Sequence, residues 1–197
     1  SLYALWMQTP EPTSQEVETA LQGNLCRCTG YEPIIKAAVA VSRYGTPSSD
    51  LLNAEREHIT TRLQALHSGK RIVSGPEDNL SIIPADVDDL AHCLLSYPNA
   101  TIVAGSTDVG LWVTKFLRQI GPAIFTGHLN ALKTVEQQGG QLIIGAGASY
   151  TDCQTVLSEH LPHLIPYWNR IAGWQVRNMG TVGGNIANGS PIGDTPP

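Results

Sequence analysis

Two closely spaced cysteines constrain this chain more than any other feature. Cys26 and Cys28 lie in the segment "GNLCRCTGY", separated by one arginine and framed by two glycines. A C-x-C pair brings two sulfurs together, but a zinc site or a [2Fe–2S] cluster takes four ligands. Free cysteines favour apolar surroundings, whereas this pair is flanked by Arg27, Thr29 and two glycines. We therefore interpret Cys26 and Cys28 as metal ligands rather than as incidental cysteines in a turn.

The remaining cysteines and the histidines are poor candidates for the missing ligands. Cys93 flanks the apolar face of an expected helix and Cys153 opens another, so we expect both in the core or at element boundaries. The six histidines are scattered, and Pro162 interrupts the helix register of the one close pair, His160 and His163. We expect exposed or locally bonded histidines.

Composition excludes several classes of partner. The chain has 197 residues, a formal net charge of −5 and no block of Lys and Arg, which disfavours nucleic acid and anionic membrane surfaces. No apolar run approaches the ~20 residues of a membrane span. Four cysteines are too few for a disulfide scaffold, so a reducing, cytoplasmic setting is expected. The apolar start "SLYALWM" and the turn-like end "SPIGDTPP" suggest a piece of a longer chain.

The first 44 residues predict a small helical unit. Thr13 and Glu16 form a capping-box pattern at the start of a helix over 13–22, and Pro33 suits the first turn of a helix through "IIKAAVAVSRY". That second helix is apolar nearly all round, so we expect it to be buried against "SLYALWM". Residues 45–72 predict a solvated, partly helical linker.

From residue 73 onward the pattern predicts an α/β domain. "ATIVAG", "PAIFTGHL" and "QLIIGAGA" read as buried strands. Asp86 can cap a helix, and Thr151 with Gln154 can open another. The first of these helices has an expected apolar face made of Val87, Leu90, Ala91, Leu94 and Leu95. The fold class is therefore α+β, a helical unit followed by the first part of an α/β domain.

Two glycine-rich segments of this domain could bind a ligand. "VAGSTDVG" lacks the Lys and Ser/Thr of a Walker A motif, and Tyr150 occupies the third glycine position of a Rossmann reading of Gly145 and Gly147. The turn can still present backbone N–H groups to an anion, although for this segment taken alone an ordinary β-turn is the better explanation.

The second glycine-rich segment favours a ligand-binding site over an ordinary turn. "RNMGTVGGNIANGSPIGD" carries five glycines and three asparagines, and we interpret residues 173–197 as a polar loop system. Ordering so long a plain loop would be costly. Glycines permit close backbone contact and the amides supply neutral hydrogen bonds. Two such loops in one domain favour the diphosphate of a dinucleotide.

These motifs together resemble a known family. "QGNLCRCTGYEPI" is similar to the second [2Fe–2S] signature of the molybdenum hydroxylases, the xanthine dehydrogenase/aldehyde oxidase family. "IVAGSTDVG" and "GTVGGNIANGSPIGD" resemble its two flavin-binding segments, in the family's order. The fused order resembles the small iron–sulfur/FAD subunit of bacterial xanthine dehydrogenases, because members of the carbon monoxide dehydrogenase type keep the two domains on separate subunits.

The resemblance implies cofactor sites residue by residue. It makes Cys26 and Cys28 ligands of a [2Fe–2S] cluster, whose C-x2-C partners would precede Ser1. Ser106 and Asp108 stand where the family often has Asn and Glu. Ile171 stands where some members place an aromatic against the flavin. The implied FAD contacts are Ile102, Val103, Ala104, Gly105, Ser106, Thr107, Asp108, Val109, Ile171, Thr181, Val182, Gly183, Gly184, Asn185 and Asp194.

The resemblance also implies an electron-transfer role. A molybdenum centre on a large partner subunit would hydroxylate a purine or an aldehyde, and electrons would pass through the clusters to FAD and then to NAD. No acid–base catalytic residue is expected here, because that chemistry lies on the partner of a hetero-oligomer. The alternatives are an interaction module without cofactors, another molybdenum hydroxylase such as an aldehyde oxidase, and a zinc protein that takes ligands from a second copy.

Overall fold

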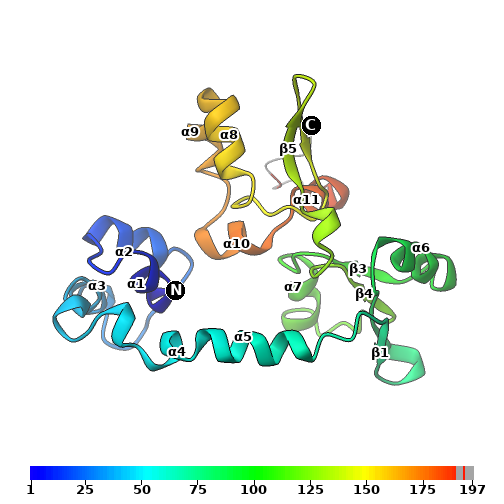
Figure 1. Ribbon diagram of the computed structural model, residues 1–197, viewed down its shortest axis with the longest axis horizontal. Helices are drawn as coiled ribbons and strands as arrows, with labels where there is room; N and C mark the ends of the chain where they lie inside the picture. Colours follow the sequence, from blue (N-terminus) through cyan, green and yellow to red (C-terminus); the bar gives the residue numbers. More distant parts are fainter. Residues whose placement is uncertain (190–192, 194–197) are drawn as a thin grey trace. The chain divides into compact units, whose positions relative to one another are not determined.

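The computed structural model describes residues 1–189 and 193 (Figure 1). It contains two compact units. The first comprises Ser1–Ser68 with Gly173–Gln175, and the second comprises Gly69–Ala172 with the residues from Val176 onward. Within the described part of the chain, no helix has both the length and the apolar character needed to cross a membrane.

The first unit is helical. It contains α1 (Leu2–Gln8), α2 (Ser14–Ala20) and α3 (Tyr31–Val39), with the cysteines in the loop between α2 and α3. The Thr13 hydroxyl accepts a hydrogen bond from the Glu16 N–H, and the Glu16 carboxylate accepts one from the Thr13 N–H. The predicted capping box is confirmed.

The environment of α3 differs from the prediction. The helix packs mainly against α2 instead of α1, and Ala38 is its one buried residue. Tyr31 and Val39 are exposed. The helix has only nine residues before the chain turns into a 3-10 segment at Val41–Arg43. A helix this short with one main neighbour leaves most of its apolar surface accessible, so the expected burial is wrong within this chain.

The connector after α3 is helical and exposed. It contains a 3-10 turn (Pro47–Ser49), α4 (Leu51–Ala54) and α5 (Arg56–Ala65), and α5 has no buried residue. The Tyr3 hydroxyl donates to the Asp50 carboxylate at 2.7 Å, which ties the start of the connector to α1.

The second unit contains a four-stranded sheet. Its order is β1-β2-β4-β3, where β1 is antiparallel to β2 while β2, β4 and β3 run parallel. The predicted strands "ATIVAG" and "PAIFTGHL" are confirmed as β3 and β4, but the expected burial holds for β4 and not for β3, where only Val103 is buried. The four strands are β1 (Ile72–Ser74), β2 (Ser81–Ile83), β3 (Thr101–Val103) and β4 (Ala123–Phe125).

Helix α6 (Val87–Ser96) packs on this sheet. The Asp86 carboxylate accepts the Asp89 N–H at 2.8 Å, which confirms the predicted cap. Cys93 is fully buried in one cluster with Ile82 and Ile124 of the sheet, as expected of a core cysteine. The predicted apolar face is rotated, because Val87 and Leu95 are exposed. Burial follows the i, i+3, i+4, i+7 positions Leu90, Cys93, Leu94 and Tyr97.

A separate core forms beside the hairpin of β5 (Val135–Gln138) and β6 (Gln141–Ile144). Strand β6 was predicted, but as a buried strand, whereas none of its residues is fully buried. Helices α8 (Gln154–His160) and α9 (Ile165–Trp168) contribute to it. Thr151 does not cap α8; the side chains of Ser149 and Asp152 instead accept each other's backbone N–H. The buried members of this core are Ala148, Tyr150, Cys153, Leu157, Trp168 and Ile171.

The described part of the glycine-rich C-terminal segment is mostly helical, contrary to the predicted loop system. It forms α10 (Trp174–Met179) and α11 (Val182–Asn188). The Thr181 hydroxyl caps α11 by accepting the Gly184 N–H at 3.2 Å. Gly189 ends the helix in the left-handed region, with φ 55°. Local capping and tertiary packing outweigh the low helix propensity of the glycines.

Candidate cofactor sites

The cysteine loop brings its two sulfurs together. The Sγ atoms of Cys26 and Cys28 lie 2.8 Å apart, and the Cys28 N–H donates to Cys26 Sγ at 3.4 Å. Cys28 is exposed and Cys26 is half-buried. Gly30, with φ 86°, makes the turn into α3. Two convergent, accessible thiols are a donor set that suits a thiophilic metal centre.

Hydrogen bonds also favour the thiolate form of Cys26. The Cys28 side chain, followed by the backbone N–H groups of Cys28 and Gly30, lowers the pKa of Cys26 to about 7. Metals bind cysteine as the thiolate, so this loop lowers the cost of deprotonating a ligand.

Within the described residues, this pair is the only candidate ligand set. Among residues 1–189 and 193, no group of three or more His, Cys, Asp and Glu side chains could hold a metal ion. Cys93 and Cys153 are both 0% exposed, and burial raises the pKa of Cys153 to about 11. Cys26 and Cys28 therefore fit two of the four ligands of a [2Fe–2S] cluster.

The first candidate flavin segment lies at the carboxyl end of β3. Ser106 has φ 62°, in the left-handed region. In the described structure, the backbone N–H groups of Gly105, Ser106 and Thr107 donate no hydrogen bond. Successive free N–H groups around such a residue form an anion-binding nest. Ligands of parallel sheets bind at this edge, so the turn fits the diphosphate of FAD.

The rest of this segment flanks the nest. Ile102 and Val103 belong to β3, where Ile102 is exposed and Val103 is buried. Ala104 precedes the nest, exposed Asp108 follows it, and Val109 begins α7 (Val109–Thr114).

The structure brings the second candidate segment next to the first. A Cβ at Gly105 would overlap the carbonyl oxygen of Met179 and lie 3.0 Å from Gly180 Cα. The first segment therefore touches the residues immediately before Thr181. Thr181 itself forms an isolated β-bridge with Ser149. Two segments about 75 residues apart thus meet at one place.

Residues 181–184 already have structural roles. The N–H groups of Val182 and Gly183 donate to the carbonyls of Ala148 (2.9 Å) and Ala146 (3.1 Å). A Cβ at Gly183 would lie 2.6 Å from the Ala146 side chain. Gly183 is therefore explained by close packing. The flavin contacts of Thr181, Val182, Gly183, Gly184 and Asn185 stay predictions.

Two further predicted contacts remain to be considered. Ile171 is 2% exposed and packs in the core beside β5 and β6, surrounded by protein. Asp194 lies outside the described residues. Their roles toward FAD also stay predictions.

Sequence reasoning missed the residues after β4. Thr126 donates its N–H to the Val103 carbonyl at 3.0 Å, and Gly127 lies beside Ala104. His128 is exposed, as expected, but its Nε2 lies 2.6 Å from the Pro84 carbonyl oxygen, 44 positions away. The polar end of "PAIFTGHL" was the available signal, because parallel neighbouring strands end at the same edge.

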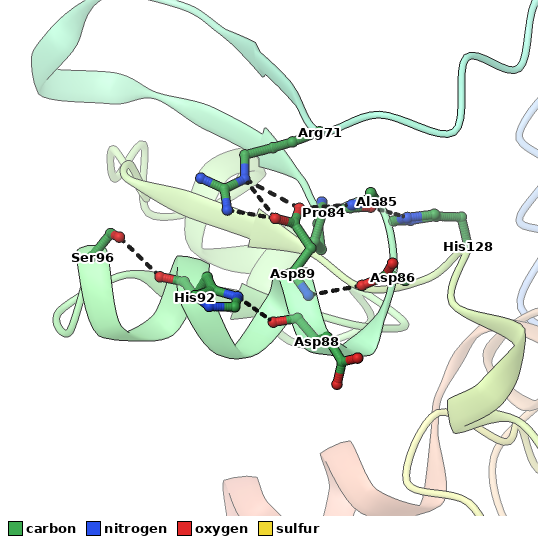
Figure 2. Close-up of polar contacts among 9 residues, drawn as sticks. All are labelled: Arg71, Pro84, Ala85, Asp86, Asp88, Asp89, His92, Ser96 and His128. Atoms are coloured by element: carbon green, nitrogen blue, oxygen red, sulfur yellow. Dashed lines mark hydrogen bonds and ion pairs between the residues drawn. The ribbon is translucent and has the colours of Figure 1, made fainter.

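Figure 2 shows how the loop between β2 and α6 is fixed at this edge. Arg71 Nε lies 3.1 Å from both carboxylate oxygens of Asp89, and Asp89 Oδ2 accepts the Ala85 N–H at 2.8 Å. The Arg71 hydrogen bonds, followed by that of Ala85, lower the pKa of Asp89 to about 2. His128 secures the same loop through Pro84.

Comparisons with known proteins match both parts of the chain. The sequence model of the FAD-binding domain in molybdopterin dehydrogenase matches residues 77–197, and that of the [2Fe–2S]-binding domain matches residues 1–39. Xanthine dehydrogenase of Drosophila subobscura is 27% identical over 100% of this chain and 18% of its own length. Human aldehyde oxidase is 28% identical over the same shares. The chain thus spans about a fifth of these relatives.

Solved structures of carbon monoxide dehydrogenases are similar to part of the chain. The enzyme from Hydrogenophaga pseudoflava, in a form lacking the Mo-pyranopterin moiety of its molybdenum cofactor, gives a TM-score of 0.53 at 26% identity, covering 60% of this chain and 42% of that one. A Cu,Mo-containing carbon monoxide dehydrogenase gives 0.54 at 25% identity, covering 62% and 43%.

Proposed function

Because the chain belongs to the family of FAD-binding domains of molybdopterin dehydrogenases, we propose that it is the electron-transfer part of a xanthine dehydrogenase-like molybdenum hydroxylase. Electrons enter from a molybdenum centre on a large partner subunit, pass through [2Fe–2S] clusters to FAD, and leave to NAD. The assembly is a cytoplasmic hetero-oligomer.

One observation carries this proposal: both cofactor-binding domains occur on one chain, each with a matching local geometry. The [2Fe–2S]-binding match contains the convergent thiols of Cys26 and Cys28. The FAD-binding match contains the nest at Gly105–Thr107. An iron–sulfur centre and a flavin together suit the transfer of electrons between one-electron and two-electron carriers.

The chain's own residues bind and orient these cofactors. Cys26 and Cys28 hold iron through thiolates. The N–H groups of Gly105, Ser106 and Thr107 bind the diphosphate of FAD without a formal positive charge. Fixing both segments to a rigid sheet edge holds the flavin in place. FAD supplies the two-electron chemistry when bound.

The proposed substrate is xanthine, with an aldehyde as the second candidate. The second candidate is kept because human aldehyde oxidase matches the chain at 28% identity and the insect xanthine dehydrogenase at 27%. Steady-state assays of the enzyme that carries this chain, with xanthine or an aldehyde as donor and NAD or O2 as acceptor, separate the four combinations.

The cofactors are tested directly on the purified full-length protein that carries this chain. We expect flavin absorption bands and an iron–sulfur shoulder, with FAD released by denaturation. Absence of both signals would overturn the proposal and favour an interaction module without cofactors. Stoichiometric zinc with no iron would instead favour a zinc site at Cys26 and Cys28.

A further inference from the structure

Thr29 follows the second cysteine directly, and its hydroxyl faces that cysteine's sulfur. Thr29 Oγ1 lies 3.7 Å from Cys28 Sγ, within hydrogen-bond reach of a sulfur atom. Among the described residues, the Thr29 hydroxyl makes no other hydrogen bond. Its proton is therefore available to this sulfur.

Ligation fixes the direction of this hydrogen bond. A free Cys28 thiol and the Thr29 hydroxyl could each donate. A cysteine that binds iron has lost its proton and can only accept. The hydroxyl is then the donor, and Cys28 Sγ is the acceptor.

We propose that Thr29 is a positioning residue that raises the reduction potential of the cluster bound through Cys28. This inference rests on the proposed function. Reduction adds negative charge to the cluster and its sulfur ligands, and a hydroxyl donor stabilises that charge more in the reduced than in the oxidised state. Hydrogen bonds to the sulfurs are a general determinant of cluster potentials.

A second contact in the same loop supplies a matched control. The Cys26 N–H donates to the Tyr31 hydroxyl at 3.4 Å. The Tyr31 side chain thus holds the loop through the backbone of Cys26 and not through a cysteine sulfur. Tyr31→Phe removes this support and leaves the Thr29 contact in place. Thr29→Ser keeps the hydroxyl and removes a methyl group, whereas Thr29→Val keeps the shape and removes the hydroxyl.

The test is a redox titration of the holoenzyme followed by electron paramagnetic resonance. Thr29→Val is expected to lower the equilibrium constant for one-electron reduction of this cluster roughly tenfold. This corresponds to a downward shift of the reduction potential of about 59 mV. Thr29→Ser is expected to stay close to the wild type, and the flavin potential and the iron content are expected to be unchanged. Tyr31→Phe is expected to shift the potential less than Thr29→Val.

Three results would overturn the inference. An unchanged potential in Thr29→Val would remove Thr29 from this role and leave the proposed function standing. Equal shifts in Thr29→Val and Tyr31→Phe would assign the effect to loop geometry instead of the hydroxyl. A wild-type protein without any cluster signal would overturn this inference and the proposed function together.

Discussion

Gly105 is the residue through which the two candidate flavin segments touch. Its backbone carries the first N–H of the nest, and its missing side chain leaves room for the carbonyl of Met179. A single methyl group at this position therefore affects both the packing of the second unit and the shape of the anion site.

Gly105→Ala should lower both stability and flavin binding. The added methyl group would overlap the Met179 carbonyl, and overpacking of this kind typically costs about 1–3 kcal/mol. We expect a lower free energy of unfolding in urea and a reduced FAD content. Gly127→Ala is the matched control at the same sheet edge, because its Cβ would lie an ordinary 3.5 Å from the Ala104 carbonyl oxygen. Equal effects of the two substitutions would contradict this account.

Asp89 should make the second unit sensitive to acid. Its pKa is about 2 in the folded state, where Arg71 and the Ala85 N–H stabilise the carboxylate, against about 3.9 in an unfolded chain. The stabilisation is fully present above about pH 3.9 and is lost as the pH falls toward 2. Urea unfolding at successive pH values should therefore show a steeper loss of stability for the wild type than for Asp89→Asn.

Asp88→Asn is the control for this acid dependence. Asp88 lies beside Asp89 on α6, but its carboxylate is drawn without a contact in Figure 2. This variant keeps the Arg71–Asp89 pair and should keep the wild-type slope. If stability depended less on pH in Asp88→Asn and as in the wild type in Asp89→Asn, the acid sensitivity would come from Asp88, and the account given for Asp89 would be wrong.

At the scale of elements, α11 depends on one hydroxyl. Thr181 is 9% exposed and its Oγ1 accepts the Gly184 N–H at the start of a helix that contains two glycines. Loss of such a cap costs about 0.5–2 kcal/mol. We expect Thr181→Ala to lower the free energy of unfolding by this amount and Thr181→Ser to retain most of it. Similar losses in both variants would show that the methyl group, not the hydroxyl, carries the effect.

The elements also show what sequence alone could predict. The caps at Thr13 and Asp86 were predicted correctly from local residues. The same kind of local pattern failed at Thr151, because Ser149 and Asp152 bond each other's backbone N–H instead. Helix α11 was missed because its glycines are explained by contacts far along the chain, such as that of Gly183 with Ala146. Burial of α3 was wrongly expected because an apolar pattern does not specify which neighbour covers it.

The candidate sites also contain local features that the sequence predicts and long-range features that it does not. The adjacent thiols of Cys26 and Cys28 and the turn after β3 were predicted, since their chemistry lies within a few residues. The neighbourhood of Thr126, Gly127 and His128 was missed. It depends on the strand order β2-β4-β3, which brings the ends of non-consecutive strands together.

For the whole molecule, the two units predict separable cofactor sites. The cysteine pair lies in the first unit and the nest at Gly105–Thr107 lies in the second. Cys28→Ser removes one of the thiolates without altering the second unit. We therefore expect iron and labile sulfide of this cluster to be lost while FAD remains close to the wild-type ratio.

Gly105→Ala should produce the reverse pattern in the same holoenzyme. The added methyl group disturbs the nest, whereas the loop of Cys26 and Cys28 belongs to the other unit. Iron should stay at the wild-type level as FAD falls, measured by metal analysis and by flavin release on the same samples. If either variant lost both cofactors together, the sites would be interdependent, and a chain with two separately loaded units would be the wrong description. If each lost only its own, electron transfer between the two centres could be studied with one centre removed at a time.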